Sequence, residues 1–185
     1  MKLNKYMKTM AAALVLTGGG LTACESDDIQ VSRADESGYQ SSMKPVAYVV
    51  SQNGKRQNDL LEFRNSGAFN LYLGISKAAP SDMQVSLEYA PAVLERYNNQ
   101  NGTAYQALPQ ELVTIAEDAL LAKGDKQSAA MGVSVTTHAD LEATATYVVP
   151  LKGKVSGNGV ELSANQSEFL LFVKDYSKVP DCAKA

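Results

Sequence analysis

Residues 83–115 read MQVSLEYAPAVLERYNNQNGTAYQALPQELVTI, and the interpretation of the whole chain starts from this stretch. Its first part alternates, with apolar Val85, Leu87 and Tyr89 separated by polar residues, which is the period of a strand with one buried face. The period then becomes that of a short helix, because apolar residues recur at i, i+3, i+4 and i+7: Ala90, Val93, Leu94 and Tyr97. The stretch therefore predicts a strand that runs directly into an amphipathic helix.

The residues that flank this apolar stripe mark the two ends of the helix. Pro91 suits the first helical turn, where a missing N–H leaves no hydrogen bond unmade. Asn101-Gly102 supplies a left-handed stop at the C-terminal end. A second strand is predicted at Leu112–Ile115, so a strand, a helix over Pro91–Gln100 and a strand follow one another.

Short apolar runs separated by turn signals fill most of the chain from residue 45 onward. In the clearest of them, four apolar residues alternate with polar or small ones: Phe69, Leu71, Leu73 and Ile75. Further strands are predicted at residues 46–50, 60–64, 119–122, 131–135, 147–151 and 169–173. Such a series of short strands favours an antiparallel β-sandwich, and a small α+β fold built around the helix is the alternative.

Two of these strands carry a signal about their place in a sheet. Phe169 to Val173 is apolar on both faces, which is typical of a central strand. Pro150 has no N–H to donate to a ladder, so it predicts an edge position or a bulge for the strand at 147–151.

Residues 1–23 have the pattern of a lipoprotein signal peptide. Lys2, Lys5 and Lys8 form a positive region before a short apolar core. The run from Leu21 to Cys24, L-T-A-C, resembles the bacterial lipobox, which implies that Cys24 is lipidated and that the acyl chains anchor the protein in a membrane. The alternative is an ordinary secretory signal in which the Cys is accidental.

A polar segment, residues 24–44, is predicted to be a flexible acidic tether. It begins with E-S-D-D at Glu25–Asp28, which is similar to the surface-export signal of Bacteroidetes lipoproteins. That similarity implies an outer membrane lipoprotein exposed at the cell surface. The alternative is a solvated tether with no sorting role.

The remaining residues suffice for one domain, predicted at 45–175, with a linker or frayed tail at 176–185. The predicted signal peptide contains three Lys and no acidic residue, so its removal changes the formal charge from −3 to −6. An acidic chain of this kind argues against nucleic acid as a partner. With Cys24 lipidated, Cys182 has no partner in the chain for a disulfide or a Cys-based metal site.

No residue pattern in the chain carries recognisable catalytic chemistry. His138 is the only histidine, and neither G-x-S-x-G nor H-E-x-x-H occurs. The acidic pairs at Glu117-Asp118 and around Asp140 and Glu142 are interpreted as solvated loop charges, since glycoside hydrolysis needs two carboxylates held across a sugar. We therefore expect no catalytic residue, no metal ligand, no cofactor and no enzyme activity within these residues.

Sugar binding is a separate hypothesis, because Tyr combines an apolar face with a hydrogen-bonding tip. Tyr89 and Tyr97 fit the predicted core stripe, whereas three others are freer and share no pattern: Tyr39, Tyr72 and Tyr105. The run from Asn98 to Asn101, N-N-Q-N, could bond sugar hydroxyls or could cap the helix. The sequence thus leaves any ligand-binding residues unknown.

Several motifs occur together in one order along the chain. After the lipobox and the acidic tether come A-Y-V-V at 47–50, F-N-L-Y-L-G-I-S-K at 69–77, V-S-L-E-Y-A-P-A-V-L-E-R-Y-N at 85–98 and Y-V-V-P-L-K-G-K at 147–154. This order resembles the N-terminal domain of Bacteroidetes surface lipoproteins known as domain of unknown function family 1735. The resemblance covers Pro45 to about Asp175 and implies an immunoglobulin-like β-sandwich.

In that family the domain commonly precedes a second module in glycan-use systems, such as a family-18 endo-β-N-acetylglucosaminidase or a lectin-like domain. The resemblance supplies no catalytic residue for this domain, and the family-18 signature D-x-x-D-x-D-x-E is absent. It predicts a non-catalytic, lipid-anchored surface module that spaces or positions a glycan-processing partner domain, with the chain continuing after Ala185. The alternatives are a standalone carbohydrate-binding lipoprotein and the N-terminal fragment of a family-18 enzyme.

Overall fold

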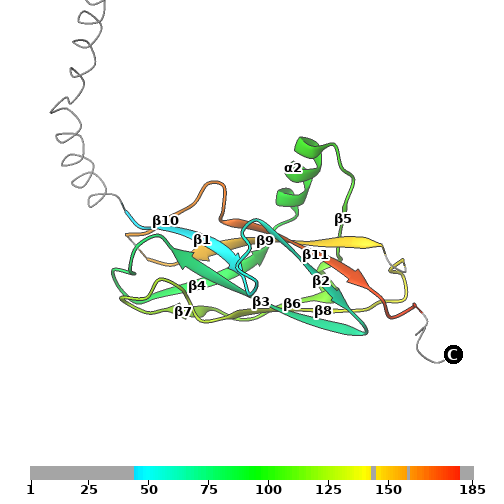
Figure 1. Cartoon of the computed structure of the whole chain (residues 1–185), viewed down its shortest axis with the longest axis horizontal. Coiled ribbons are helices and arrows are strands. Elements are labelled where there is room, and N and C mark those ends of the chain that lie inside the picture. Colours follow the sequence, from blue (N-terminus) through cyan, green and yellow to red (C-terminus); the bar gives the residue numbers. More distant parts are fainter. Residues whose placement is uncertain (1–43, 143–144, 158, 180–185) are drawn as a thin grey trace, which may run out of the picture. The chain divides into compact units, whose positions relative to one another are not determined.

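A computed structural model describes residues 44–142, 145–157 and 159–179. The predicted signal peptide, Cys24, the tether as far as Met43 and Cys182 lie outside the described residues. Two curled sheets lie face to face with one α-helix beside them (Figure 1), which confirms the predicted β-sandwich with a helix inserted after a central strand.

The first sheet has the strand order β10-β1-β3-β8-β6. Its strands are β1 (Val46–Ser51), β3 (Ser66–Ile75), β6 (Val113–Ile115), β8 (Met131–Thr136) and β10 (Glu161–Leu162). The long strand β3 is central because it pairs antiparallel with β1 on one side and β8 on the other. Strand β10 extends the sheet by pairing parallel with β1.

The second sheet has the order β2-β11-β9-β4-β7, and β5 adds to β9. Its strands are β2 (Asn58–Phe63), β4 (Met83–Tyr89), β5 (Gln106–Ala107), β7 (Ala119–Leu121), β9 (Thr146–Val155) and β11 (Glu168–Asp175). The pairings of β2 with β11 and of β5 with β9 are parallel. The sandwich is therefore mainly antiparallel, with three parallel pairings that the sequence pattern did not predict.

The core lies between the two sheets and follows the predicted alternation. Leu71 and Leu73 of β3 are fully buried, and so are Leu151 of β9 and Phe169 of β11. Burying one such side chain stabilises the folded state by roughly 1.5–3 kcal/mol, so burial of these apolar side chains is the main contribution that holds the two sheets together. The predicted central strand 169–173 lies in β11, between β2 and β9.

The helix α2 (Pro91–Asn101) begins at the predicted residue and ends one residue after the predicted end at Gln100. Pro91 occupies the first turn, and Gly102 adopts a left-handed conformation with φ 63°. The apolar stripe packs on the outer face of the second sheet, where Val93 and Leu94 form a small cluster with Val148 and Leu170. A short 3-10 helix, η1 (Gln110–Leu112), follows and replaces the first residue of the strand predicted at Leu112.

The expectation that Pro150 marks an edge position or a bulge is wrong, because β9 lies inside the second sheet and its register with β11 runs through Pro150 without interruption. The carbonyl of Pro150 accepts a hydrogen bond of 2.9 Å from the backbone N–H of Ala90, just beyond the end of β4. In an antiparallel strand the N and O atoms of one residue face the same neighbour, so the absent N–H also faces away from β11. On this side of β9, the pairing with β4 stops at Leu151, opposite Tyr89, and β5 pairs only with Tyr147 and Val148. Pro150 lies between the two pairings, so no ladder bond is lost there.

Candidate functional site

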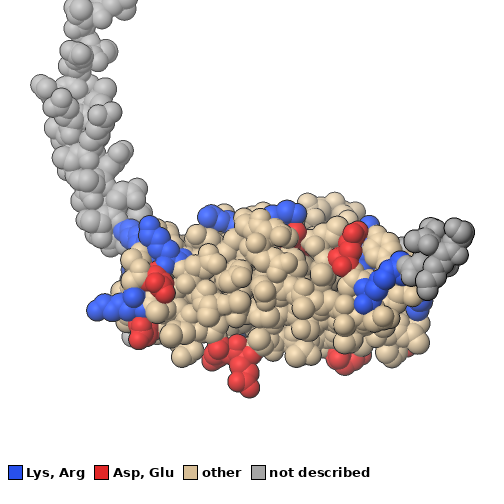
Figure 2. Space-filling view, turned by 60° about the horizontal axis from the view of Figure 1, so that its bottom comes forward, with Lys and Arg blue, Asp and Glu red and all other residues tan. Residues whose placement is uncertain are grey.

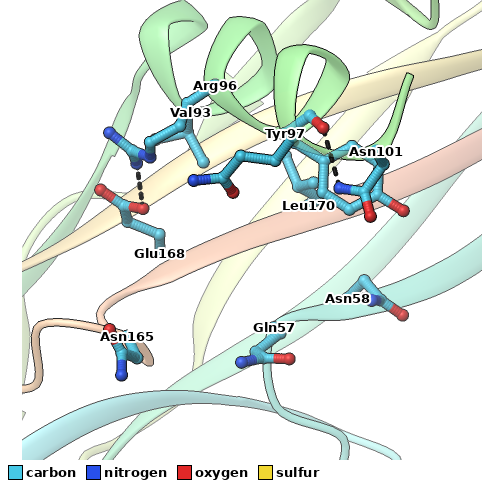
Figure 3. Close-up of a pocket in the computed structure, with 10 residues that line it drawn as sticks. Gln57, Asn58, Val93, Arg96, Tyr97, Asn101, Asn165, Glu168 and Leu170 are labelled. Carbon is cyan, nitrogen blue, oxygen red and sulfur yellow. Dashed lines mark hydrogen bonds and ion pairs between the residues drawn. The ribbon is translucent and has the colours of Figure 1, made fainter. Parts of the chain in front are cut away.

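An open groove of about 310 Å³ lies between α2 and the strands β2 and β11. Figure 3 shows residues of α2 along one wall and Gln57, Asn58 and Asn165 opposite them. The lining residues are Gln57, Asn58, Val93, Arg96, Tyr97, Gln100, Asn101, Asn165, Glu168 and Leu170. Most of them are polar, and five are Asn or Gln.

The helical wall is formed by Arg96, Tyr97, Gln100 and Asn101. Figure 3 shows Arg96, Tyr97 and Asn101 on the side of α2 that faces β11. The side-chain amide of Asn101 donates a hydrogen bond of 2.8 Å to the carbonyl of Tyr97, which ties the last turn of the helix together. The guanidinium of Arg96 pairs with the carboxylate of Glu168 at the start of β11. Because this pair cancels its own charge, the groove carries no net charge.

The opposite wall is held by the strand pairing beneath it. The backbone N–H of Leu170 donates a hydrogen bond of 2.8 Å to the carbonyl of Gln57, directly before β2 begins. Gln57 has φ 78°, in the left-handed region that residues other than glycine seldom adopt. The wall thus has a fixed backbone in an uncommon conformation.

Asp59, two residues along, fixes the loop that carries this wall. Its buried carboxylate accepts hydrogen bonds from the Lys55 ammonium, the Leu60 N–H, the Asn53 amide and the Ser51 hydroxyl, each 2.8–2.9 Å long. Burial by itself raises the pKa of Asp59, but these four hydrogen bonds outweigh it and leave the pKa below its ordinary value. Asp59 is therefore a buried, hydrogen-bonded carboxylate that holds the loop before β2 in place.

Arg56 connects the two loops that form the wall opposite α2. Its guanidinium lies 4.0 Å from the centre of the Tyr48 ring and donates a hydrogen bond of 3.2 Å to the side chain of Gln166, the neighbour of Asn165. Tyr48 in turn lies over Gly74, where an added Cβ would come within 2.4 Å of the ring. Contacts of Arg56 thus link the residue next to Asn165 to Tyr48 on β1.

The groove offers hydrogen bonding over an apolar floor. Val93 and Leu170 are buried beneath it, and Tyr97 forms edge contacts with Phe172, their ring centres 6.3 Å apart. Among the described residues, no cluster of His, Cys, Asp and Glu could hold a metal ion. The groove therefore presents side-chain amides above an apolar floor.

The sugar-binding hypothesis named several residues, and the structure separates them. Tyr97 contributes to both the packing and the groove, whereas Tyr89 donates a hydrogen bond of 2.6 Å to the carbonyl of Leu108 and belongs to the core. Tyr105 is half exposed beside Phe172, outside the groove. Tyr72 lies on β3 in the other sheet, and Tyr39 lies outside the described residues.

The run of Asn and Gln at the end of α2 divides between capping and the groove. Asn98 ties the segment after the helix to its last turn, because its side chain donates to the carbonyl of Tyr105 and accepts from the Thr103 hydroxyl at 2.8 Å. Gln100 and Asn101 line the groove, and Asn99 is exposed outside it. The run therefore contributes both to the end of the helix and to the lining of the groove, and bonding to a sugar stays a prediction.

The titratable loop residues lie away from the groove. His138 is exposed, and its Nδ1 lies 3.3 Å from a carboxylate oxygen of Asp140 in the same turn. Glu117, Asp118 and Glu142 are also exposed, and none of these five residues lines the groove. The structure does not bring them together into a site.

The sequence interpretation missed Gln57, Asn58, Asn165 and Glu168. They reach the groove only because β2 and β11, more than a hundred residues apart in the chain, pair in parallel. A weak local signal existed at Gln57-Asn58, where two amides precede an alternating strand, but such a pair is also typical of an ordinary turn. No spacing rule links these residues to Gln100.

The segment after β11 forms a second ordered feature, here called the C-terminal clasp, residues Asp175–Val179. The backbone N–H of Tyr176 donates to the Phe63 carbonyl at 2.9 Å, and the Asn65 N–H donates to the Ser177 hydroxyl at 2.6 Å. Lys178 donates to the Ala139 carbonyl at 2.6 Å. The clasp therefore joins the end of β11 to two loops of the sandwich.

Asp175 organises this clasp as Asp59 organises the groove wall. Its carboxylate accepts hydrogen bonds from the Ser177 hydroxyl, from the Ser177 N–H at 2.8 Å and from the Thr137 hydroxyl. Burial raises the pKa of Asp175, but these bonds and the charge of Lys178 outweigh burial and lower the pKa.

Charged side chains form no continuous field on the face shown in Figure 2, where Lys, Arg, Asp and Glu lie singly or in small groups among uncharged residues. This face lacks the basic stripe that marks a nucleic-acid interface. Within the described residues, no helix has the length and apolar character needed to cross a membrane.

Similar folds occur in solved structures of Bacteroides proteins. EndoBT-3987 of Bacteroides thetaiotamicron, solved with a Man5GlcNAc product, has a TM-score of 0.65 and 20% identity over 75% of this chain and 33% of that chain. A candidate carbohydrate-binding protein of Bacteroides ovatus has a TM-score of 0.59 and 20% identity over 69% of this chain and 36% of that chain.

A multidomain protein of Bacteroides ovatus that includes DUF1735 has a TM-score of 0.51 and 13% identity over 69% of this chain and 45% of that chain. At these identities the likeness shows the fold. The chain spans between a third and a half of the length of these three relatives.

No curated protein matches the sequence. A family model described as an N-terminal domain matches residues 39–159, which is well over half of the chain and includes β4, α2 and β9. The chain therefore belongs to this family of N-terminal domains, the immunoglobulin-like domain of unknown function 1735 that its strand–helix motif resembles.

Proposed function

We propose that this chain is a non-catalytic module at the surface of the outer membrane, anchored by a lipid on Cys24, that positions a glycan-processing partner domain. The observation that carries the proposal is the match to a family of N-terminal domains, together with solved relatives at least twice as long as the region they share. An N-terminal domain of this kind lies between its anchor and whatever follows it.

The C-terminal clasp supports the positioning role. A flexible exit would let a following domain swing freely, whereas Tyr176, Ser177 and Lys178 are each hydrogen-bonded to the sandwich. A chain that leaves the sandwich through such contacts starts in a fixed direction. The clasp thus gives the module a physical means of orienting a partner.

Two relatives of known structure are connected with glycans, and they suggest the class of partner. EndoBT-3987 is solved with a Man5GlcNAc product, and a second relative is described as a candidate carbohydrate binder. We therefore propose that the partner acts on a glycan, either as a later domain of the same polypeptide or as a separate protein. The lipobox and the acidic run Glu25–Asp28 support surface display.

The first experiment is to read the coding sequence beyond the Ala185 codon. An open frame that encodes a second domain supports positioning within one polypeptide. An in-frame stop codon overturns that form of the proposal and leaves only a separate partner.

The second experiment deletes residues 45–175 in the cell and keeps the tether and any following domain. Release of glycan from a high-mannose glycoprotein should fall several-fold with intact cells and stay unchanged in lysates, because only the presentation of the partner is lost. An unrelated immunoglobulin-like domain of similar length, inserted as a control, should restore part of the loss. Unchanged release by intact cells would contradict the positioning role.

A further inference from the structure

Four of the five amide side chains of the groove are exposed to solvent and are free to bind a ligand, whereas the amide of Asn101 donates to the Tyr97 carbonyl. Within the described part of the chain, the side chains of Gln57, Asn58, Gln100 and Asn165 form no hydrogen bond with another residue. Each such amide donates and accepts hydrogen bonds, which is also what each hydroxyl of a sugar does. From this match we infer that the groove is a binding site for a neutral oligosaccharide.

The charges in the groove exclude other ligand classes. Arg96 is the only cation in the lining, and it is already paired with Glu168. A phosphate, sulfate or uronate would meet a guanidinium whose charge is already balanced and would lie beside the like charge of Glu168. A purely apolar ligand would leave the amides unsatisfied, which costs binding free energy. A neutral ligand rich in hydroxyls meets neither obstacle.

The floor of the groove suits the apolar side of a sugar ring. Val93 and Leu170 are buried beneath the amides, and Tyr97 adds an aromatic surface held by Phe172. Sugar rings present C–H groups on one side and hydroxyls at the rim, so a floor of this kind below a polar rim can contact both. Tyr is suited to such sites because its ring is apolar and its tip is polar.

The backbone of the wall opposite α2 is held in place before any ligand binds. Gln57 is held in its left-handed conformation by the hydrogen bond from Leu170, and the loop before it is fixed on Asp59. Gln166, the neighbour of Asn165, accepts a hydrogen bond of 3.2 Å from Arg56, and its carbonyl accepts one of 2.8 Å from the Val49 N–H. Side chains on a fixed backbone lose less freedom when a ligand binds, so more of the interaction appears as affinity.

The size of the groove sets the expected strength of binding. About 310 Å³ is at the lower end of the range of ligand pockets, roughly 300–1,000 Å³, so the groove holds a short part of a glycan chain. Because the site is open and small, we expect a dissociation constant on the order of 0.1–10 mM. Affinity in this range is useful when the ligand is polymeric and many copies of the protein share a surface.

Titration followed by nuclear magnetic resonance tests the inference. A 15N-labelled version that begins at Glu25 is titrated first with Man5GlcNAc and then with neutral cello-, xylo- and malto-oligosaccharides. A sulfated oligosaccharide and an Asn- and Gln-rich peptide serve as competing ligand classes. The result expected is that at least one neutral oligosaccharide shifts the side-chain amide signals of the groove.

Matched variants make the test specific. Gln100→Ala combined with Asn165→Ala should weaken binding about tenfold or more, because two amide contacts are lost. Asn99→Ala is the control, since Asn99 is exposed on the same helix and outside the groove. Circular dichroism spectra check that all three versions are folded.

Three outcomes would overturn the glycan site: no shift of groove signals with any neutral oligosaccharide, equal binding by the double variant, or tighter binding of the sulfated ligand or the peptide. The titration uses this chain alone and needs no partner. Its result is therefore independent of the proposed positioning role.

Discussion

Ser51 and Asp59 are joined by a hydrogen bond of 2.8 Å, and their buried side chains lie at the two ends of the loop that shapes the groove. A buried carboxylate is unfavourable unless it is paired and hydrogen-bonded. Asp59 meets this condition through the four donors that surround it. The loop is thus organised around a charge, whereas the rest of the sandwich is organised around apolar side chains.

Asp59→Ala should lower the free energy of unfolding by about 2–4 kcal/mol, because it leaves the Ser51 hydroxyl and other donors without their acceptor. Asp59→Asn keeps some of the hydrogen bonds and should cost less. Urea unfolding at pH 7 measures both losses. A loss below about 0.5 kcal/mol for the Ala variant would show that the network is not structurally important.

The same carboxylate makes stability depend on pH in one direction. The pKa of Asp59 in the folded state lies below its ordinary value, so its stabilisation is fully present above the unfolded pKa of about 3.9 and is lost as the pH falls through the folded pKa. Asp175 acts in the same direction. Unfolding at pH 7 and pH 3 should therefore show a smaller acid-induced loss in Asp59→Asn than in the unaltered protein.

Leu94→Ala should destabilise the domain by about 2–4 kcal/mol, the range for a buried leucine, because Leu94 is 3% exposed in the cluster beneath α2. Glu95→Ala, at the next position and exposed to solvent, should change stability by less than about 0.5 kcal/mol. Urea unfolding of the two variants compares them directly. Equal losses would contradict the observed register of the helix.

Gly74→Ala should destabilise by about 1–3 kcal/mol, since the new methyl group would lie 2.4 Å from the Tyr48 ring and would displace it. Gly132→Ala is the matched control on the same sheet, because the nearest side-chain atoms to its added methyl are 3.9 Å away. Thermal unfolding of both variants distinguishes them. A melting temperature lowered equally by both would mean that loss of glycine, and not contact with Tyr48, is responsible.

Cys24→Ala should leave the protein in the aqueous fraction or uncleaved, because the lipobox cysteine carries the proposed anchor. Membrane fractionation of cells that express each version measures this. Retention in the membrane fraction equal to that of the unaltered protein would rule out acylation at Cys24 as the anchor.

The helix and most strands could be predicted because their signals are local. The i, i+3, i+4, i+7 stripe located α2, and the alternation around Leu71 and Leu73 located β3. The place of Pro150 could not be predicted, because it depends on a gap between β4 and β5 that only the assembled sheet creates. Local patterns report burial, but they do not report which strands become neighbours.

The groove was beyond prediction for a related reason. Its walls join Gln57 to Asn165 and Gln100 through the parallel pairing of β2 with β11 and through the contact of α2 with β11. Asn and Gln are equally common in turns, at helix ends and in binding sites, so their types alone do not distinguish these roles. Asp59 was missed as well, because a buried carboxylate with four donors looks in the sequence like any loop acid.

The helix α2 rests on the outside of the second sheet, and its cluster around Val93 and Leu94 is separate from the core between the sheets. The core between the sheets therefore does not include the side chains of α2, which pack in a separate cluster on the second sheet. Side chains of α2 that line the groove, such as Arg96 and Gln100, can be exchanged without repacking the core between the sheets. A library randomised at these two positions would make the domain a scaffold for new recognition surfaces, with the buried anchor at Leu94 left unchanged.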